Sequence, residues 1–178
     1  MADTCGSLDH RARASVVLKC ENFQKGGAFK FRGACNAVFS LSETEAARGV
    51  ATHSSGNHAQ ALALAARLRG IPAHIVIPST SPTVKKSLVA GYGGTITLCE
   101  PTLEAREATL AQVARESGAC PIHPYNDDRI IAGQGTAALE LLQEHPDLDV
   151  VIAPVGGGGL LSGTAIAARE ISRPRGAR

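Results

Sequence analysis

Short apolar runs alternate with helical segments along most of this chain, and that alternation constrains the fold more than any other feature. Runs rich in Val, Ile and Thr predict strands at 49–53, 73–77, 95–98 and 119–123. Helices are predicted at 58–69, 82–90 and 102–117, two of them closed by Gly70 and Gly118. This order predicts an α/β fold, with open parallel sheets covered by helices on both faces.

The same pattern extends to both sides of this region. A strand at 15–20 precedes a helix at 29–41, and a helix at 135–144 precedes an almost wholly apolar strand at 149–155 and a last helix at 160–170. The final residues, 171–178, are basic and contain Pro174, so we expect a disordered tail there.

Lys30 is the lysine best suited to nucleophilic chemistry. Of five lysines it alone is enclosed by apolar and small residues on both sides. Desolvation lowers the pKa of an amine and favours the neutral form that a Schiff base with an aldehyde requires. The alternative is a lysine that extends from a helix start into solvent. Spacing alone leaves both interpretations open.

A polar turn, Ser54 to His58, joins a predicted strand to a predicted helix. Hydroxyls, an amide and helix N-terminal N–H groups converge there, where an anion such as a carboxylate could bind. The alternative is ordinary helix capping, with Ser55 or Asn57 as the N-cap and Gly56 making the turn.

Four consecutive glycines, Gly156, Gly157, Gly158 and Gly159, follow the last predicted strand and precede a helix. Glycine lets the backbone approach a phosphate closely, and the run lacks the Gly-Lys-Ser/Thr ending of a nucleotide P-loop. A plain connector is the alternative. Taken together, the lysine, the polar turn and the glycine loop indicate a site for an aldehyde cofactor that carries a phosphate, pyridoxal 5'-phosphate.

Composition excludes several other classes of function. A net charge of +2, an aromatic share of 3% and the lack of Trp argue against a nucleic-acid partner. The five cysteines are widely spread without a Cys-x-x-Cys pair, which favours reduced thiols. The start of the chain predicts no signal peptide or membrane span, so we expect a cytoplasmic protein. The histidines form no metal-binding pattern, and no Gly-x-Ser-x-Gly elbow is present.

Several segments resemble the serine racemase and serine/threonine dehydratase family, the fold-type-II (tryptophan synthase beta-like) pyridoxal-phosphate enzymes. The matching segments are 19–24, 29–34, 52–60, 70–78, 132–136 and 154–159. The resemblance implies a small α/β domain at 49–126 inserted in a larger domain, of which 1–48 and 127–170 form part. Family members extend beyond both ends of the match, so we expect a truncated chain with an incomplete large domain.

The resemblance also implies roles for individual residues. Lys30 would carry the cofactor as a Schiff base and move protons on one face of the substrate α-carbon, and Ser55 would act on the opposite face. Asn57 would bind the cofactor ring hydroxyl. Ser54 and the backbone of Gly56 to His58 would hold the substrate carboxylate. The phosphate would be bound by Gly156, Gly157, Gly158 and Gly159.

The implied reactions are racemisation of serine and elimination of ammonia from serine or threonine, in a homodimer. Lys25 and Tyr92 match positions that contact an activating nucleotide such as ATP. The acidic loop that binds Mg²⁺ or Ca²⁺ in the family is absent from this chain. Ala28 and Tyr125 depart from the usual serine and asparagine. The alternative is an inactive fragment that binds the cofactor weakly or associates with full-length family members.

Overall fold

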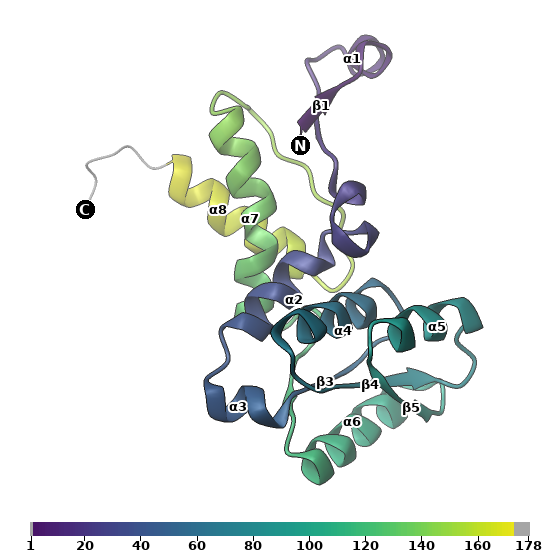
Figure 1. Cartoon of the computed structure of the whole chain (residues 1–178). Coiled ribbons are helices and arrows are strands. Elements are labelled where there is room, and N and C mark those ends of the chain that lie inside the picture. The colour runs from purple at the N-terminus through teal and green to yellow at the C-terminus, as the bar shows by residue number, and fades with distance from the viewer. Residues whose placement is uncertain (1, 173–178) are drawn as a thin grey trace.

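A four-stranded parallel sheet, in the order β5-β4-β3-β6, lies at one end of the molecule (Figure 1). The computed structural model describes residues 2–172. The strands of this sheet are β3 (Val50–His53), β4 (Ala73–Pro78), β5 (Thr95–Cys99) and β6 (Cys120–Pro121). All four residues of β3 are buried, which agrees with its place inside the sheet.

Helices cover both faces of this sheet. On one face lie α4 (Asn57–Arg69) and α5 (Thr83–Gly91), and on the other lies α6 (Leu103–Ser117) (Figure 1). Most residues of α4 are buried because this helix packs on the sheet and also contacts α2 (Lys30–Phe39) and α5. The alanines of α4 present little bulk and therefore allow these neighbours to approach closely. The α/β fold predicted from the sequence is confirmed.

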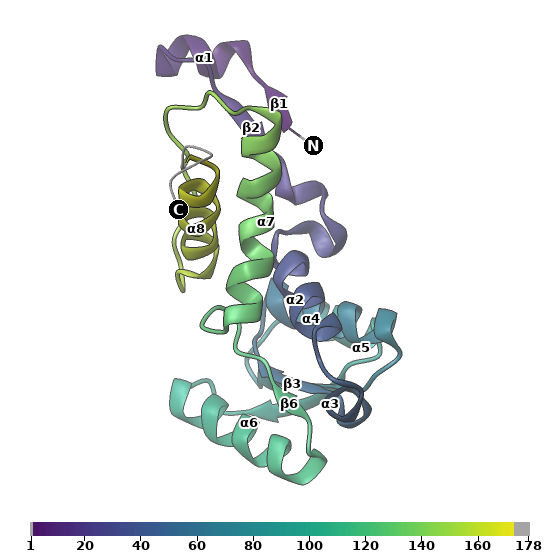
Figure 2. The same ribbon diagram turned by 90° about the vertical axis from the view of Figure 1, so that its left-hand side faces the viewer.

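Apart from α3 (Glu43–Arg48), which lies beside the sheet and contacts β6, the other elements lie beyond α2, away from the sheet (Figure 2). Two long helices, α7 (Asp128–Glu144) and α8 (Gly159–Ser172), pack side by side, and α7 also crosses α2. The remaining elements are β1 (Ala2–Thr4), α1 (Gly6–Ala12), β2 (Val17–Lys19) and the 3₁₀ turns η1 (Glu21–Phe23) and η2 (Lys25–Gly27). Strands β1 and β2 form a separate antiparallel pair that the sequence pattern did not predict.

The strand predicted at 149–155 is wrong, since no strand forms there. A strand needs hydrogen bonds to a neighbouring strand, and no strand among the described residues pairs with this segment. The side chains of Val150, Ile152 and Val155 are exposed, and Ile152 is 91% exposed. Val151 and Ala153 line a pocket of about 220 Å³ that also includes residues of α7.

Two predicted helix boundaries also need correction. Helix α7 begins at Asp128 rather than at residue 135, because the Asp127 carboxylate caps it by accepting from the Arg129 N–H at 2.9 Å. Ile171 and Ser172 belong to α8, although a tail was predicted from 171 onward. The rest of that predicted tail, residues 173–178, lies outside the described residues.

Glycines allow α2 and α7 to cross at very short range. A Cβ on Gly133 would lie 2.6 Å from the Gly33 Cα and 2.7 Å from the Arg32 carbonyl oxygen. The Gly33 N–H, in the first turn of α2, donates to the Gln134 side-chain oxygen at 3.3 Å, although Gln134 belongs to α7. Helix α7 thus caps part of the N-terminal turn of α2.

Charged groups secure the same crossing. Arg32 donates to both oxygens of Glu21 at 2.6 and 2.8 Å and to both oxygens of Glu140 at 2.7 and 2.8 Å. Lys19 also pairs with Glu140, at 2.8 Å. These hydrogen bonds, with Arg32 first, hold the pKa of Glu140 down, from 4.5 to about 2. The network joins β2 and η1 to both crossing helices.

We expect Gly133→Ala to destabilise the chain by about 2 kcal/mol or more, because the added methyl group meets backbone atoms that cannot rotate away. Gly91→Ala is the matched control, since a Cβ on this helical glycine meets nothing within 4 Å. Urea unfolding of both variants measures the difference. Equal stability of the two variants would contradict the close crossing.

The low pKa of Glu140 predicts a stability contribution that depends on pH. A carboxyl group with a depressed folded-state pKa stabilises the fold above its unfolded pKa, and this contribution disappears as the pH falls from about 4.5 to about 2. Glu140→Gln should therefore be less stable than the wild type at pH 7 and should lose less stability over that interval. Glu43→Gln is the control, because the Glu43 side chain is 96% exposed. Urea unfolding at several pH values measures both.

Candidate active site

Lys30 occupies the first position of α2, and its amine is held by the main chain of a distant segment. The Lys30 Nζ donates to the Pro124 carbonyl oxygen at 2.7 Å. The side chain is partly buried, and desolvation lowers the pKa of its amine. The sequence left open the alternative that this lysine extends into solvent. The hydrogen bond to Pro124 and the partial burial of the side chain do not agree with it.

The polar turn 54–57 lies between the carboxyl end of β3 and the start of α4. Gly56 is the N-cap of α4, and no side chain caps that helix. Ser54 Oγ accepts from the Gly56 N–H at 3.3 Å, within the turn itself. The alternative that Ser55 or Asn57 is the N-cap is therefore wrong. The first-turn amides of α4 receive no capping side chain, and an anion could bind them.

Three histidines gather around this turn and Lys30. The rings of His53 and His123 meet edge to face with centroids 5.9 Å apart. Desolvation lowers the pKa of both imidazoles, and for His53 the neighbouring His123 lowers it further. His58 is buried, and its pKa falls to about 3 because of desolvation first and the Lys30 charge second. These shifts favour the uncharged form of each ring.

The glycine loop packs against a single aromatic ring. A Cβ on Gly157 would collide with the ring of Tyr125, and one on Gly159 would lie 2.8 Å from the Tyr125 carbonyl oxygen. Gly158 has φ +89°, a conformation that residues with side chains rarely adopt. Gly156 and Gly157 are exposed, and Gly159 begins α8. The loop is therefore built from backbone, with its open side at a helix N-terminus.

The segment His123 to Asn126 links these parts, and the sequence analysis missed its importance. Pro124 binds the Lys30 amine, and Tyr125 packs on the glycine loop and, with centroids 4.5 Å apart, on His123. His123 Nδ1 accepts from the N–H groups of Tyr125 and Asn126, at 3.3 and 2.9 Å. The available signal was position: this segment follows β6, whose carboxyl end lies at the same sheet edge as the end of β3.

Two further residues, Lys25 and Tyr92, were predicted to contact an activating nucleotide rather than to belong to this site. Lys25 lies in η2 with its amine 5.7 Å from the centroid of the Phe31 ring. Tyr92 is the C-cap of α5. Neither residue contributes to the Lys30, turn and loop arrangement described above.

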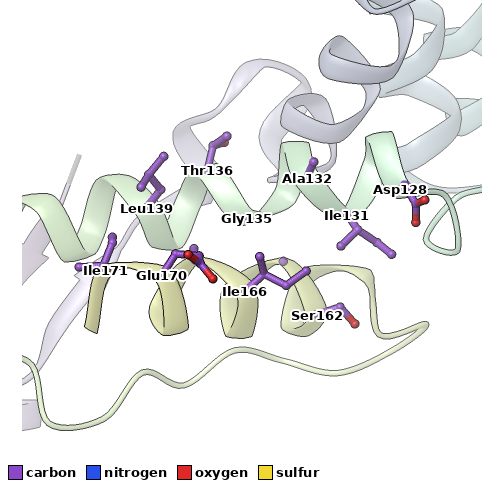
Figure 3. A pocket seen from close by; sticks show the side chains of 12 residues that line it. Asp128, Ile131, Ala132, Gly135, Thr136, Leu139, Ser162, Ile166, Glu170 and Ile171 are labelled. Atoms are coloured by element: carbon purple, nitrogen blue, oxygen red, sulfur yellow. The ribbon is translucent and has the colours of Figure 1, made fainter. Parts of the chain in front are cut away.

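An apolar groove of about 470 Å³ lies between α7 and α8 (Figure 3). Ile131, Leu139 and Ile166 line it, together with the acids Asp128 and Glu170. Its lining includes neither Lys30 nor the polar turn, so we assign the candidate active site to the edge of the sheet instead.

The fold and site define an α/β protein of the fold-type-II class, and comparison with known proteins gives its family. The family model for "Pyridoxal-phosphate dependent enzyme" matches residues 4–177. A beta-hydroxyaspartate dehydratase of Paracoccus denitrificans is 56% identical over 92% of this chain, and a serine racemase of Arabidopsis thaliana is 54% identical over 94%. The chain belongs to the pyridoxal-phosphate dependent enzyme family, as the resemblance in the sequence predicted.

Solved structures agree with this assignment. The serine racemase of Dictyostelium discoideum superposes with a TM-score of 0.93 at 48% identity, over 96% of this chain and 56% of its own. Threonine deaminase isoform 2 of Solanum lycopersicum superposes with a TM-score of 0.91 at 35% identity, over 97% of this chain and 47% of its own. The chain spans about half the length of the curated relatives it matches: 52% of the dehydratase and 51% of the Arabidopsis racemase.

The residues present fit the cofactor of this family. The amine of Lys30 has a lowered pKa, and the start of α4 lacks a side-chain cap. The glycine loop could not accept a side chain at Gly157. Two further findings concern the described residues as a whole. No helix among them is long and apolar enough to cross a membrane, and no three His, Cys, Asp or Glu side chains form a group that could hold a metal ion.

Gly157→Ala tests the glycine loop. We expect it to weaken pyridoxal-phosphate binding about tenfold or more, because the added methyl group displaces the Tyr125 ring that supports the loop. Gly156→Ala should weaken binding less, since a Cβ there meets nothing within 4 Å. Equilibrium titration with the cofactor, monitored by absorbance, gives the three dissociation constants. The reverse order of the two variants would contradict the proposed loop geometry.

Proposed function

We propose that this chain carries pyridoxal phosphate on Lys30 and acts on small β-hydroxy amino acids. The reactions are the interconversion of serine enantiomers and the elimination of ammonia from serine or threonine. One observation carries the proposal: Lys30 binds the Pro124 carbonyl at 2.7 Å, and the adjacent Tyr125 packs on Gly157. A nucleophilic amine and a phosphate-binding loop therefore meet on one short segment.

Specific residues would hold the cofactor. Lys30 provides the covalent attachment, Asn57 binds the ring hydroxyl, and the phosphate lies on the backbone of Gly156, Gly157, Gly158 and Gly159 at the start of α8. When bound, the cofactor withdraws electrons from the substrate α-carbon and so makes its proton acidic.

Other residues of the turn would bind and protonate the substrate. Ser54 and the amides of Gly56 to His58 bind its carboxylate, since no side chain caps α4. Lys30 moves a proton on one face of the α-carbon. The half-buried Ser55 hydroxyl moves a proton on the other face.

Two proton-transfer groups on opposite faces account for both reactions. A proton removed from one face and returned to the other inverts the α-carbon. Departure of the β-hydroxyl as water after the same proton loss gives elimination instead. The enamine that is released becomes an imine, which water hydrolyses to a keto acid and ammonia. The names of the relatives support this choice of substrates. They are a serine racemase, a beta-hydroxyaspartate dehydratase and a threonine deaminase, and each name contains an amino acid with a β-hydroxyl group.

A second candidate function rests on the exposed apolar side chains of Val150, Ile152 and Val155. Apolar side chains in contact with water favour association, so in this alternative the chain binds the cofactor weakly and acts only in association with full-length family members. The family resemblance carries further proposals. The chain would form a homodimer, ATP would activate it through Lys25 and Tyr92, and Mg²⁺ or Ca²⁺ would also activate it.

Lys30→Ala tests the proposed function. Wild-type protein mixed with pyridoxal phosphate and then separated from unbound cofactor should show a visible absorbance band that changes on addition of L-serine. Lys30→Ala should show neither effect, because it lacks the amine that attaches the cofactor. Borohydride reduction followed by mass spectrometry should place the cofactor on the peptide that contains Lys30.

Lys85→Ala is the control, because Lys85 lies in α5 and has no proposed part in the site. It should behave like the wild type. Identical spectra for the wild type and Lys30→Ala would contradict the proposed function. A band that depends on Lys30 but does not respond to serine would favour the second candidate function.

A further inference from the structure

His58 is a buried histidine whose ring has no hydrogen-bond partner. His58 is the second residue of α4 and is only 2% exposed. Neither Nδ1 nor Nε2 makes a hydrogen bond to any residue that the structure describes. The Ile122 backbone lies close enough to raise the pKa of the ring slightly, but it does not form a hydrogen bond of acceptable geometry.

An unpaired imidazole in this position opposes folding. A neutral imidazole has one N–H donor and one acceptor nitrogen, and burial without partners removes both from water with no compensation. A leucine or phenylalanine would fill similar space without that cost. Packing therefore does not explain why a histidine is found here. A polar group that forms a hydrogen bond with the ring in another state of the site would explain it.

Lys30 is the charged group that acts most strongly on the His58 ring, ahead of His123 and His53. No carboxylate is among those influences, whereas Glu107 and Asp127 act on His123. In the structure the Lys30 amine donates to the Pro124 carbonyl. That bond must break before the amine can attach to a cofactor.

We propose that His58 is a positioning residue for Lys30, and that its uncharged ring accepts a hydrogen bond from the Lys30 amine when the amine leaves the Pro124 carbonyl. This inference rests on the proposed function, because it assumes that Lys30 attaches the cofactor. The ring nitrogen provides an acceptor for the amine as it moves, so the amine does not lose all its hydrogen bonds. Because the ring resists protonation, it guides the amine without adding a second positive charge.

The test compares the rate of cofactor attachment with stability. Wild type, His58→Leu and His58→Gln are mixed with excess pyridoxal phosphate at one pH, and attachment to Lys30 is followed by absorbance and confirmed by borohydride reduction and mass spectrometry. Thermal unfolding of the cofactor-free proteins is measured in parallel. Thr52→Val is the matched control, since the buried Thr52 hydroxyl on β3 is also unpaired.

We expect His58→Leu to melt at the wild-type temperature or higher and to attach the cofactor about tenfold more slowly or worse. His58→Gln should recover most of the rate, because its amide oxygen is an acceptor. Thr52→Val should melt no lower than the wild type and attach the cofactor at the wild-type rate. Slow attachment by Thr52→Val would overturn the proposal, because the effect would then not be specific to His58.

Other outcomes would also overturn the inference. Wild-type attachment by His58→Leu would mean that the ring has no part in positioning Lys30. Slow attachment by both His58 variants would mean that ring shape, not its acceptor nitrogen, matters. If His58→Leu does not fold, His58→Phe replaces it, and failure of both to fold would show that the ring nitrogens serve stability. Absence of attachment in the wild type itself would contradict the proposed function, on which this inference depends.

Discussion

The close crossing of α2 on α7 is the constraint on which the rest of the site depends. Gly33 and Gly133 bring the two backbones together, and Gln134 caps the first turn of the helix that begins with Lys30. Arg32 then binds two carboxylates across the same crossing. Because Lys30 is the first residue of α2, the position of its amine relative to the sheet is set by this contact with a helix about a hundred residues away in sequence.

Burial of basic side chains is the second property of the site. Lys30, His53, His58 and His123 converge at the carboxyl edge of the parallel sheet, and desolvation is the largest cause of the lowered pKa of each. A lowered pKa favours the uncharged form of a base, which can accept protons and hydrogen bonds. Ligands of open α/β sheets bind at this edge because helices begin there and leave their N–H groups free.

The sequence predicted the elements between residues 49 and 118 with small errors at their ends. Each of them has its own local signal, such as the buried run Val50–His53 or the helix-ending Gly70, whose φ is +74°. Prediction failed where the outcome depends on distant partners. The segment 149–155 has the composition of a strand, but no strand among the described residues pairs with it. Helix α7 extends through Gly133 and Gly135 because these glycines allow close packing on other helices.

By itself the sequence determined the family, the α/β class and the identity of the chemical groups: one lysine in apolar surroundings, a polar turn and a glycine loop. Only the tertiary structure decided how these groups meet, through the segment His123 to Asn126, and which alternatives to discard, such as Ser55 or Asn57 as the cap of α4. It also revealed that the His58 ring is buried without a partner. The physical reason is range: hydrophobic periodicity, turns and motifs are encoded by neighbouring residues, whereas desolvation and hydrogen-bond satisfaction depend on residues brought together from the whole chain.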